Sequence, residues 1–253
     1  MSYQDNPFPA EAFSGLAAME SSHWWFRARN QILLWILSTK IRPKINYLEV
    51  GCGTGFVLEA VAKKFSWLNL EATEYYGAGL HVAKQRTPSC LFREMDAIVM
   101  NDCNRYECIG CFDVLEHIEN DEVVISNFYQ ALQPSGSLIL TVPQHLWLWS
   151  AADDFAHHMR RYSRREMFTK LRRVGFKITY ASSFVSLLLP LMAAQRFGGP
   201  RKATEDYTIN DILDVNPILD RILYVTMLLE FALLKLGIRF PAGGSLVVVA
   251  FKP

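Results

Sequence analysis

The stretch that decides the fold is INYLEVGCGTGFVLEAVAKK, residues 45–64. Residues 45–50 have the length and apolar character of a buried strand, and residues 56–64 continue with a helical pattern. Three glycines lie between the two segments. Glycine permits a tight turn there and lets backbone amides approach a ligand closely at the N-terminus of a helix. The stretch therefore predicts a strand, a ligand-binding turn and a helix in succession.

The same alternation of strand and helix continues along the chain. Further strands are predicted at 68–73, 91–95, 106–112, 137–142, 176–181 and 245–251. Helices are predicted at 23–40, 78–86, 121–132 and 164–174, the last with a capping box formed by Ser163 and Glu166 and an end at Gly175. Strands that alternate with helices indicate an α/β fold whose parallel sheet carries helices on both faces.

Residues 182–244 depart from this alternation, since they are strongly apolar and mostly helical in pattern. So long a connection is unusual inside a compact sheet and indicates an added helical segment. The predicted organisation is an N-terminal helical cap over 1–44, a core over 45–181 plus 245–253, and a helical insertion over 182–244.

Composition narrows the class of protein. Of 253 residues, 51% are hydrophobic and 20% charged, which excludes intrinsic disorder. The net charge of +1 gives no overall field that would attract nucleic acid. Five cysteines do not form a disulfide framework in a chain of this length, and no basic segment followed by an apolar one opens it, so we expect a cytoplasmic protein. No apolar run is long enough to cross a membrane, although the protein could lie on one.

Polar residues stand at the predicted ends of successive strands. Glu74 and Asp96 end the second and third strands, and Asp113 follows the fourth. Ligands of open α/β folds bind at this edge of the sheet. A dinucleotide fingerprint needs a third glycine after two spacers, but Gly55 follows one spacer and Phe56 stands in the required place, which disfavours NAD.

Together these motifs resemble the class I S-adenosylmethionine-dependent methyltransferases, in particular the small-molecule branch that includes ubiquinone-biosynthesis O-methyltransferases. The resemblance rests on LEVGCGTG at 48–55, Glu74, the Met95-Asp96-Ala97 step, CFDVLEHIEND at 111–121, LQPSGSLILTVP at 132–143 and Gly175-Phe176. It implies a Rossmann-like, seven-stranded, mostly parallel sheet whose last strand is antiparallel.

The resemblance also implies roles for individual residues toward S-adenosylmethionine. The methionine part is expected on Glu49, Gly51 and Gly53, the ribose on Glu74, and the adenine on Tyr75, Asp96 and Ala97. Asp113 is expected near the sulfonium. An aromatic residue and an arginine before the first strand close over the cofactor in some relatives, which makes Trp25 and Arg29 candidates for that role.

Catalytic candidates follow the fifth strand, where this architecture places the acceptor. A hydroxyl acceptor requires a base, and the candidates are His145, His157 and His158, with surface or packing roles as the alternative. His117 belongs to the motif after the fourth strand, which is present in this family whatever the substrate. We therefore expect it to have a structural or cofactor-positioning role and not to act as the base. Metal binding is not expected, because an offset of three residues places Cys108 and Cys111 on opposite faces of a strand.

Two segments indicate a possible surface for partners. Residues 160–177 hold eight basic side chains against one acidic side chain. This run could be a solvated helix face, or it could bind anionic lipid head groups or a phosphorylated or carboxylated substrate. Residues 217–236 could be a core helix, a homodimer face or an amphipathic helix in a membrane interface. We expect the insertion and the basic segment to form together an entrance that faces an anionic membrane surface.

The predicted function is methyl transfer from S-adenosylmethionine to an oxygen or nitrogen of a small hydrophobic or lipid-linked acceptor. A non-catalytic or regulatory S-adenosylmethionine-binding protein is the first alternative, and an NAD-dependent oxidoreductase is a weaker one. Nucleic acid is not expected as a substrate, because residues 113–116 read DVLE where nucleic-acid amino-methyltransferases carry an Asn/Asp-Pro-Pro-aromatic motif.

Overall fold

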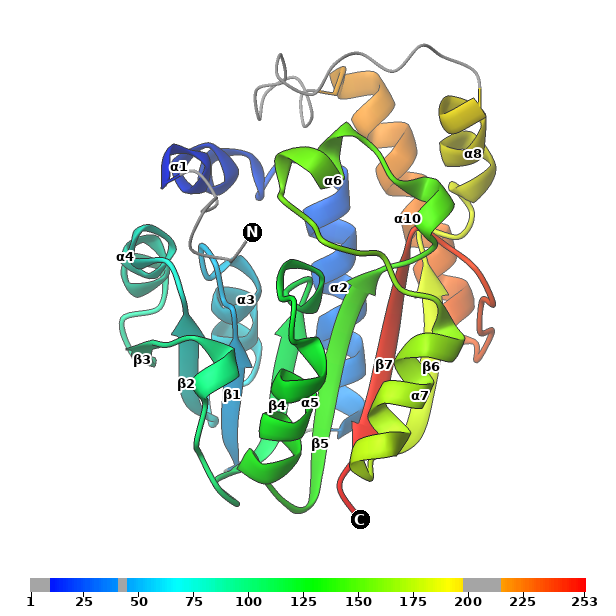
Figure 1. Ribbon diagram of the computed structural model, residues 1–253. Helices are drawn as coiled ribbons and strands as arrows, with labels where there is room; N and C mark the ends of the chain where they lie inside the picture. The colour runs from blue at the N-terminus through cyan, green and yellow to red at the C-terminus, as the bar shows by residue number, and fades with distance from the viewer. Residues whose placement is uncertain (1–9, 41–44, 198–214) are drawn as a thin grey trace.

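One seven-stranded sheet organises the chain (Figure 1). The structure is a computed structural model that describes residues 10–40, 45–197 and 215–253. The strands lie in the order β3-β2-β1-β4-β5-β7-β6, and β7 runs antiparallel to both of its neighbours while the other pairs are parallel. Their bounds are Asn46–Val50 (β1), Asn69–Glu74 (β2), Leu91–Glu94 (β3), Tyr106–Phe112 (β4), Leu132–Pro143 (β5), Lys177–Phe184 (β6) and Ser245–Phe251 (β7). The predicted Rossmann-like sheet with an antiparallel last strand is confirmed.

Helices cover both faces of this sheet. In the view of Figure 1, α5 and α7 cross the front of the sheet, while α2 and α10 lie behind it. The longer helices are α1 (Ala10–Met19), α2 (Trp24–Lys40), α3 (Phe56–Lys64), α4 (Gly77–Arg86), α5 (Asp121–Ala131), α6 (Ala151–Phe155), α7 (Arg164–Val174), α8 (Leu189–Phe197) and α10 (Pro217–Lys235). Short 3-10 turns are η1 (Ala97–Val99), η2 (Leu115–His117) and η3 (Leu146–Leu148).

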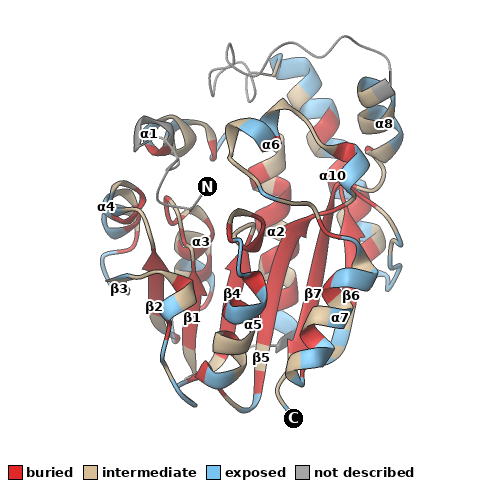
Figure 2. Cartoon of the chain, viewed as in Figure 1, coloured by how far each residue is buried: buried red, intermediate tan, exposed pale blue. Residues whose placement is uncertain are grey.

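The strands separate two apolar cores, and their residues alternate between them because side chains of a strand point to opposite faces. On β7, Val247 packs with α2, α3 and α10, whereas Val248 packs with α5 and α7. Cys108 and Cys111 of β4 likewise fall in different cores, as the strand offset predicts. Figure 2 shows the sheet as the most buried part of the chain.

Two strands extend several residues beyond their predicted ends, while the other strand ends agree to within one residue. β5 begins at Leu132 and the preceding helix ends at Ala131, because Leu132 already pairs with Tyr106 before a break in register leads to Ser137. β6 continues to Phe184, three residues into the predicted insertion, because 182–184 pair with β7. Helix α7 has the predicted bounds, with Ser163 accepting from the Glu166 amide and Gly175 at φ 114°.

Between β6 and β7 lie α8 and α10, and residues 198–214 of the predicted insertion are outside the described part of the chain. α10 packs along α2 and shares its apolar core, with Leu223, Met227 and Leu234 buried. The division of the chain into cap, core and insertion stays a prediction. Within 10–40, 45–197 and 215–253, no helix combines the length and the apolar character needed to cross a bilayer.

Candidate active site

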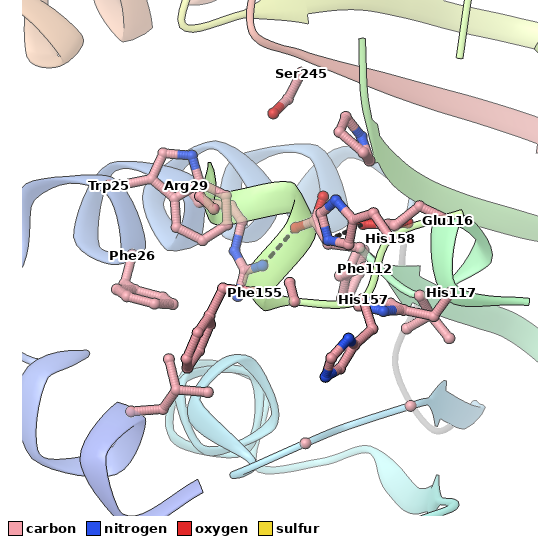
Figure 3. Close-up of a pocket in the computed structure, with 18 of the residues that line it drawn as sticks. Trp25, Phe26, Arg29, Phe112, Glu116, His117, Phe155, His157, His158 and Ser245 are labelled. Carbon is pink, nitrogen blue, oxygen red and sulfur yellow. Dashed lines mark hydrogen bonds and ion pairs between the residues drawn. The ribbon is translucent and has the colours of Figure 1, made fainter. Parts of the chain in front are cut away.

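A cavity of about 1590 Å³ opens above the carboxyl ends of β1, β2, β4 and β5 (Figure 3). It joins elements that are far apart in sequence, from α1 and α2 to α8 and α10. All ten residues predicted to contact the cofactor line this one cavity: Trp25, Arg29, Glu49, Gly51, Gly53, Glu74, Tyr75, Asp96, Ala97 and Asp113. The structure thus brings the predicted set together, while the role of each residue stays a prediction.

The turn after β1 depends on glycine at two places. Gly51 has φ 69°, and a Cβ atom there would lie 2.5 Å from the Val114 side chain, so a larger residue would collide with the turn after β4. Gly53 has φ 54° and would meet nothing within 4 Å. The backbone of Gly53 therefore faces open space in the cavity, where a ligand can approach it closely.

Two buried carboxyl groups flank this turn. Burial raises the pKa of Glu49 to about 8, although a hydrogen bond from Tyr47 and the charge of Arg29 oppose the rise. Burial also raises the pKa of Glu74, against the amides of Tyr76 and Gly53, which donate to its two oxygens at 2.9 and 2.7 Å. Each carboxylate oxygen has a second lone pair, so Glu74 can still accept from ligand hydroxyls.

Helix α2 contributes an arginine over the cavity. The guanidinium of Arg29 stacks on the Trp25 ring at 4.5 Å and pairs with Asp113, its Nη1 lying 2.5 Å from Oδ2. Its Nε is buried and has no hydrogen-bond partner within residues 10–40, 45–197 and 215–253. In Figure 3, Trp25, Phe26 and Arg29 lie on one side of the cavity, and Glu116, His117 and His158 lie on the other. The arginine is therefore placed to meet an anionic group of a ligand.

Of the adenine candidates, Asp96 and Ala97 lie just after β3, and Tyr75 directly follows β2. Oδ1 of Asp96 accepts from the Ile98 amide at 2.8 Å and so caps η1. This contact fixes the carboxylate at the cavity wall beside Ala97. Asp96 therefore combines a local structural role with the place that the sequence predicts for it.

The structure separates the three candidate bases. His157 and His158 line the cavity, whereas His145 lies outside the lining and stacks on Trp147 with ring centroids 5.7 Å apart. Nδ1 of His158 lies 2.9 Å from Oδ1 of Asp153, and Arg161 donates to both oxygens of that carboxylate. Burial opposes these contacts, but the hydrogen bonds from His158 and Arg161 lower the pKa of Asp153 overall. A carboxylate oriented in this way holds an imidazole in one tautomer.

Glu116 is a cavity residue whose role sequence reasoning missed. Its side chain is fully buried, and Oε1 lies 4.0 Å from Nε2 of His158. Neither oxygen has a hydrogen-bond partner among the residues that the structure describes. Burial followed by the nearby charge of Asp113 raises its pKa well above the ordinary range. The motif around Glu116 was visible in the sequence, but Glu116 lies in η2, which contacts α5 and β5, and the sequence does not show that packing.

One group of side chains in the described residues has a spacing that a metal ion could use. Glu116, His117 and His158 each offer one ligand atom, and these atoms all lie within 4.8 Å of one another. Burial lowers the pKa of His117 to about 3, with the charge of His158 as the next cause, so this imidazole stays neutral.

Helix α1 forms a wall of the cavity that the sequence did not reveal. Phe13, Leu16 and Glu20 line it, and Glu20 accepts hydrogen bonds from Thr54 and Arg86. The contact with Thr54 attaches α1 to the glycine turn. The ion pair between Glu20 and Arg86 holds this wall in place. The two residues are far apart in sequence, so the sequence does not show that they pair.

The far side of the cavity is apolar. Its lining there includes Val185, Leu188, Leu191, Met192, Leu219 and Leu223, which come from the region of α8 and from α10. Trp147 and Trp149, which follow β5, are absent from the lining. The cavity thus has a polar half over the strand ends and an apolar half under α8 and α10.

Comparison with known proteins places the chain in a family. The profile described as a methyltransferase domain matches residues 23–181, more than half of the sequence, so the chain belongs to the methyltransferase domain family. The predicted relation to class I S-adenosylmethionine-dependent methyltransferases is thereby confirmed, and the NAD alternative is set aside.

Individual relatives are distant. The ubiquinone biosynthesis O-methyltransferase of Paracidovorax citrulli is 28% identical over 147 residues, which cover 52% of this chain and 60% of that protein. Its counterpart in Coxiella burnetii is 27% identical over 141 residues, or 51% of this chain and 58% of that protein. The chain therefore spans less than two thirds of the length of these relatives.

Solved structures share the fold. A Haemonchus contortus phosphoethanolamine N-methyltransferase with bound S-adenosyl-L-methionine superimposes with a TM-score of 0.59 at 16% identity, over 88% of this chain and 52% of that one. The 4+2 cyclase SpnF superimposes with a TM-score of 0.62 at 16% identity, over 90% of this chain and 83% of that one. At such identities the likeness concerns the fold alone.

Proposed function

We propose that the chain transfers the methyl group of S-adenosylmethionine to an oxygen or nitrogen of a small hydrophobic or lipid-linked acceptor. The observation that carries this proposal is the two-part cavity, in which the polar residues over the strand ends and the apolar residues from α10 and the region of α8 line one continuous space. The O-methyltransferase names of distant relatives support the choice of acceptor chemistry.

The polar half suits the cofactor. Arg29 presents a positive charge for the carboxylate of an amino-acid group, and Glu49 presents a buried carboxyl group that its ammonium would meet. The unpartnered Nε of Arg29 provides a donor that no described side chain uses. Glu74 can accept from ribose hydroxyls, and Asp96 stands where an adenine amino group would donate. When bound, S-adenosylmethionine supplies a methyl group on a positively charged sulfur.

Methyl transfer from such a sulfur is an in-line displacement. A lone pair of the acceptor forms the new bond to carbon as the carbon–sulfur bond breaks, and the sulfur becomes neutral. Holding the acceptor in line and excluding water supply much of the acceleration. The apolar wall of Leu188, Met192 and Leu223 would serve both purposes for an apolar acceptor.

A hydroxyl acceptor must also lose a proton. His158 is the base that we propose, because it lines the cavity and Asp153 orients it through Nδ1. The tautomer held in this way leaves Nε2 with a free lone pair. That atom is within 4.0 Å of the fully buried Glu116, so the neighbouring carboxyl group can influence the proton once it is transferred.

The test is a screen for acceptors. Purified protein is incubated with isotopically methyl-labelled S-adenosylmethionine and with either a lipid extract or a polar metabolite extract of cells. We expect label in a compound of the lipid extract. Label confined to the polar extract would contradict the hydrophobic acceptor, and cofactor binding by calorimetry without label in either extract would favour the non-catalytic alternative.

A further inference from the structure

The outer face of α10 is apolar and exposed over its whole length. Along this helix, residues that recur at intervals of three or four share one face. That face carries Ile218, Ile222, Val225, Leu229 and Leu236, whose exposed fractions are 73, 57, 55, 57 and 80%. We call these five residues the outer stripe. Scattered exposed apolar residues are ordinary, but a continuous stripe usually marks an interaction surface.

The charges of α10 are sorted by face. Its acids turn inward: Asp220 accepts from the Trp24 amide at 2.7 Å, and Glu230 is fully buried and accepts from the amides of Ser186 and Leu187. Its basic residues, Arg221 and Lys235, are exposed. In the described part of the chain, neither forms an ion pair with an acid. The outer stripe is thus bordered by positive charge alone.

The outer stripe adjoins the mouth of the cavity. Leu219, one residue along from Ile218, lines the cavity and is still 45% exposed. Leu191 of α8 combines the same two properties, with 46% of its surface exposed. These two side chains therefore lie at the rim, where the apolar half of the cavity meets the surface that carries the stripe.

Helix α7, which carries most of the basic segment 160–177, does not adjoin the outer stripe, although Arg161 lines the cavity and Arg164 donates to the Phe240 carbonyl at 2.6 Å. α7 packs on the front of the sheet with α5, whereas α10 lies on the opposite face with α2 (Figure 1). Many of its charges are also engaged, since Lys170 pairs with Asp121 and Arg173 pairs with Glu122. A combined entrance of insertion and basic segment stays a prediction, and the membrane contact argued below rests on α10 alone.

We infer that the outer stripe of α10 docks on an anionic lipid bilayer, with Arg221 and Lys235 directed to the head groups. An exposed apolar helix face bordered by Lys and Arg is the pattern of helices that lie in the plane of a membrane interface. The long aliphatic parts of Arg and Lys can extend past the apolar stripe to reach phosphate groups. Docking in this way would place the cavity rim at Leu191 and Leu219 next to the lipid phase. The inference concerns the surface and does not depend on the acceptor.

Vesicle flotation of the full chain tests this inference. The vesicles contain phosphatidylcholine alone or phosphatidylcholine with phosphatidylglycerol, each at low and high salt. We expect flotation with the anionic vesicles, reduced by salt because charge attraction contributes to it. Ile222→Glu combined with Leu229→Glu should lower the bound fraction by about tenfold or more, and Arg221→Glu combined with Lys235→Glu should also lower it.

A matched variant on the other face provides the control. Arg165→Glu with Arg172→Glu on α7 reverses two exposed charges and should leave vesicle binding unchanged. Thermal unfolding and calorimetric cofactor binding verify that each variant is folded. Absence of flotation by the unmodified chain would overturn the inference, as would equal losses in the α7 control. A salt-insensitive dimer in sedimentation that Ile222→Glu dissociates would assign the stripe to a second copy of the chain instead.

Discussion

Oδ1 of Asp153 lies 2.9 Å from Nδ1 of His158, and this contact orients the imidazole in the cavity. We expect His158→Gln to lower kcat about 100-fold on a hydroxyl acceptor, because the positioned base is lost. Asp153→Asn should lower kcat with little change in KM, since it alters the orientation of the ring. Kinetics with the acceptor from the screen measure both effects. His145→Gln is the matched control outside the cavity, and a loss as large as that of His158→Gln would remove the basis for assigning the base.

Cofactor affinity should depend on Glu74 and not on its neighbour in the sheet. Glu74→Ala removes charge-assisted hydrogen bonds and should weaken binding by about 1.5 to 3 kcal/mol, or roughly 10- to 100-fold in Kd. Titration calorimetry with S-adenosylmethionine measures the change. Glu94→Ala is the control, because Glu94 pairs with Glu74 across β2 and β3 and does not line the cavity. Tight NADH binding with none for S-adenosylmethionine would refute the cofactor assignment.

Trp25 should contribute to the same affinity through Arg29. Loss of the ring in Trp25→Ala removes a cation–π contact of about 0.5 to 1 kcal/mol and frees the guanidinium, so Kd should rise a few-fold. Trp67→Ala, at an exposed tryptophan away from the cavity, should leave Kd unchanged. Equal Kd values for the two variants would show that Trp25 does not cover the cofactor.

The raised pKa of Glu49 should make the stability of the protein depend on pH. Its pKa is about 8 in the folded protein against an ordinary 4.5, so folding favours the protonated form. The stabilisation is fully present below pH 4.5 and is lost as the pH rises through 8. We expect the free energy of unfolding of the cofactor-free protein to decrease over this window, and to decrease less in Glu49→Gln. Denaturant unfolding at a series of pH values measures both, and parallel curves would exclude a raised pKa at this residue.

The glycine turn should tolerate no side chain at Gly51. Gly51→Ala forces a left-handed alanine and a collision with Val114, which together should cost about 1 to 3 kcal/mol of unfolding free energy. Gly237→Ala is the control, because Gly237 also has a positive φ of 93° but would meet nothing within 4 Å. Gly237→Ala should therefore lower the unfolding free energy by less, and the difference between the two variants measures the collision with Val114 apart from the backbone strain. Val114→Ala in the Gly51→Ala background should restore part of the loss.

Helices and strands whose ends are marked by nearby residues, such as caps, glycines or polar segments, could be predicted from the sequence. β4 and β7 have the predicted bounds, because each is an apolar run between polar or glycine-containing segments. α7 follows from the cap at Ser163 and the stop at Gly175. In contrast, the end of β6 at 182–184 has a Ser-Ser-Phe sequence with no strand signal of its own, and it is extended only because β7 provides partners from a distant part of the chain.

Some residues of the candidate site could likewise be predicted from the sequence, and others could not. Residues at strand ends could be placed because parallel strands bring their carboxyl ends to one edge, which is why the ten cofactor candidates share a cavity. The choice between His145 and His158 could not be made from the sequence, since both follow β5. They are distinguished by the cavity, which only His158 lines, and by its contact with Asp153. The apolar wall from α10 depends on packing against α2, a contact between opposite ends of the chain.

Helix α1 lies outside the region that matches the family, residues 23–181, and yet Phe13, Leu16 and Glu20 close one side of the cavity. A shared catalytic core is thus completed by a segment that the family pattern does not specify. Two chains with the same glycine turn can therefore differ in the shape of the space above it. Exchanging residues 10–22 between such chains would redesign that space while the strand ends, and the chemistry they hold, remain untouched.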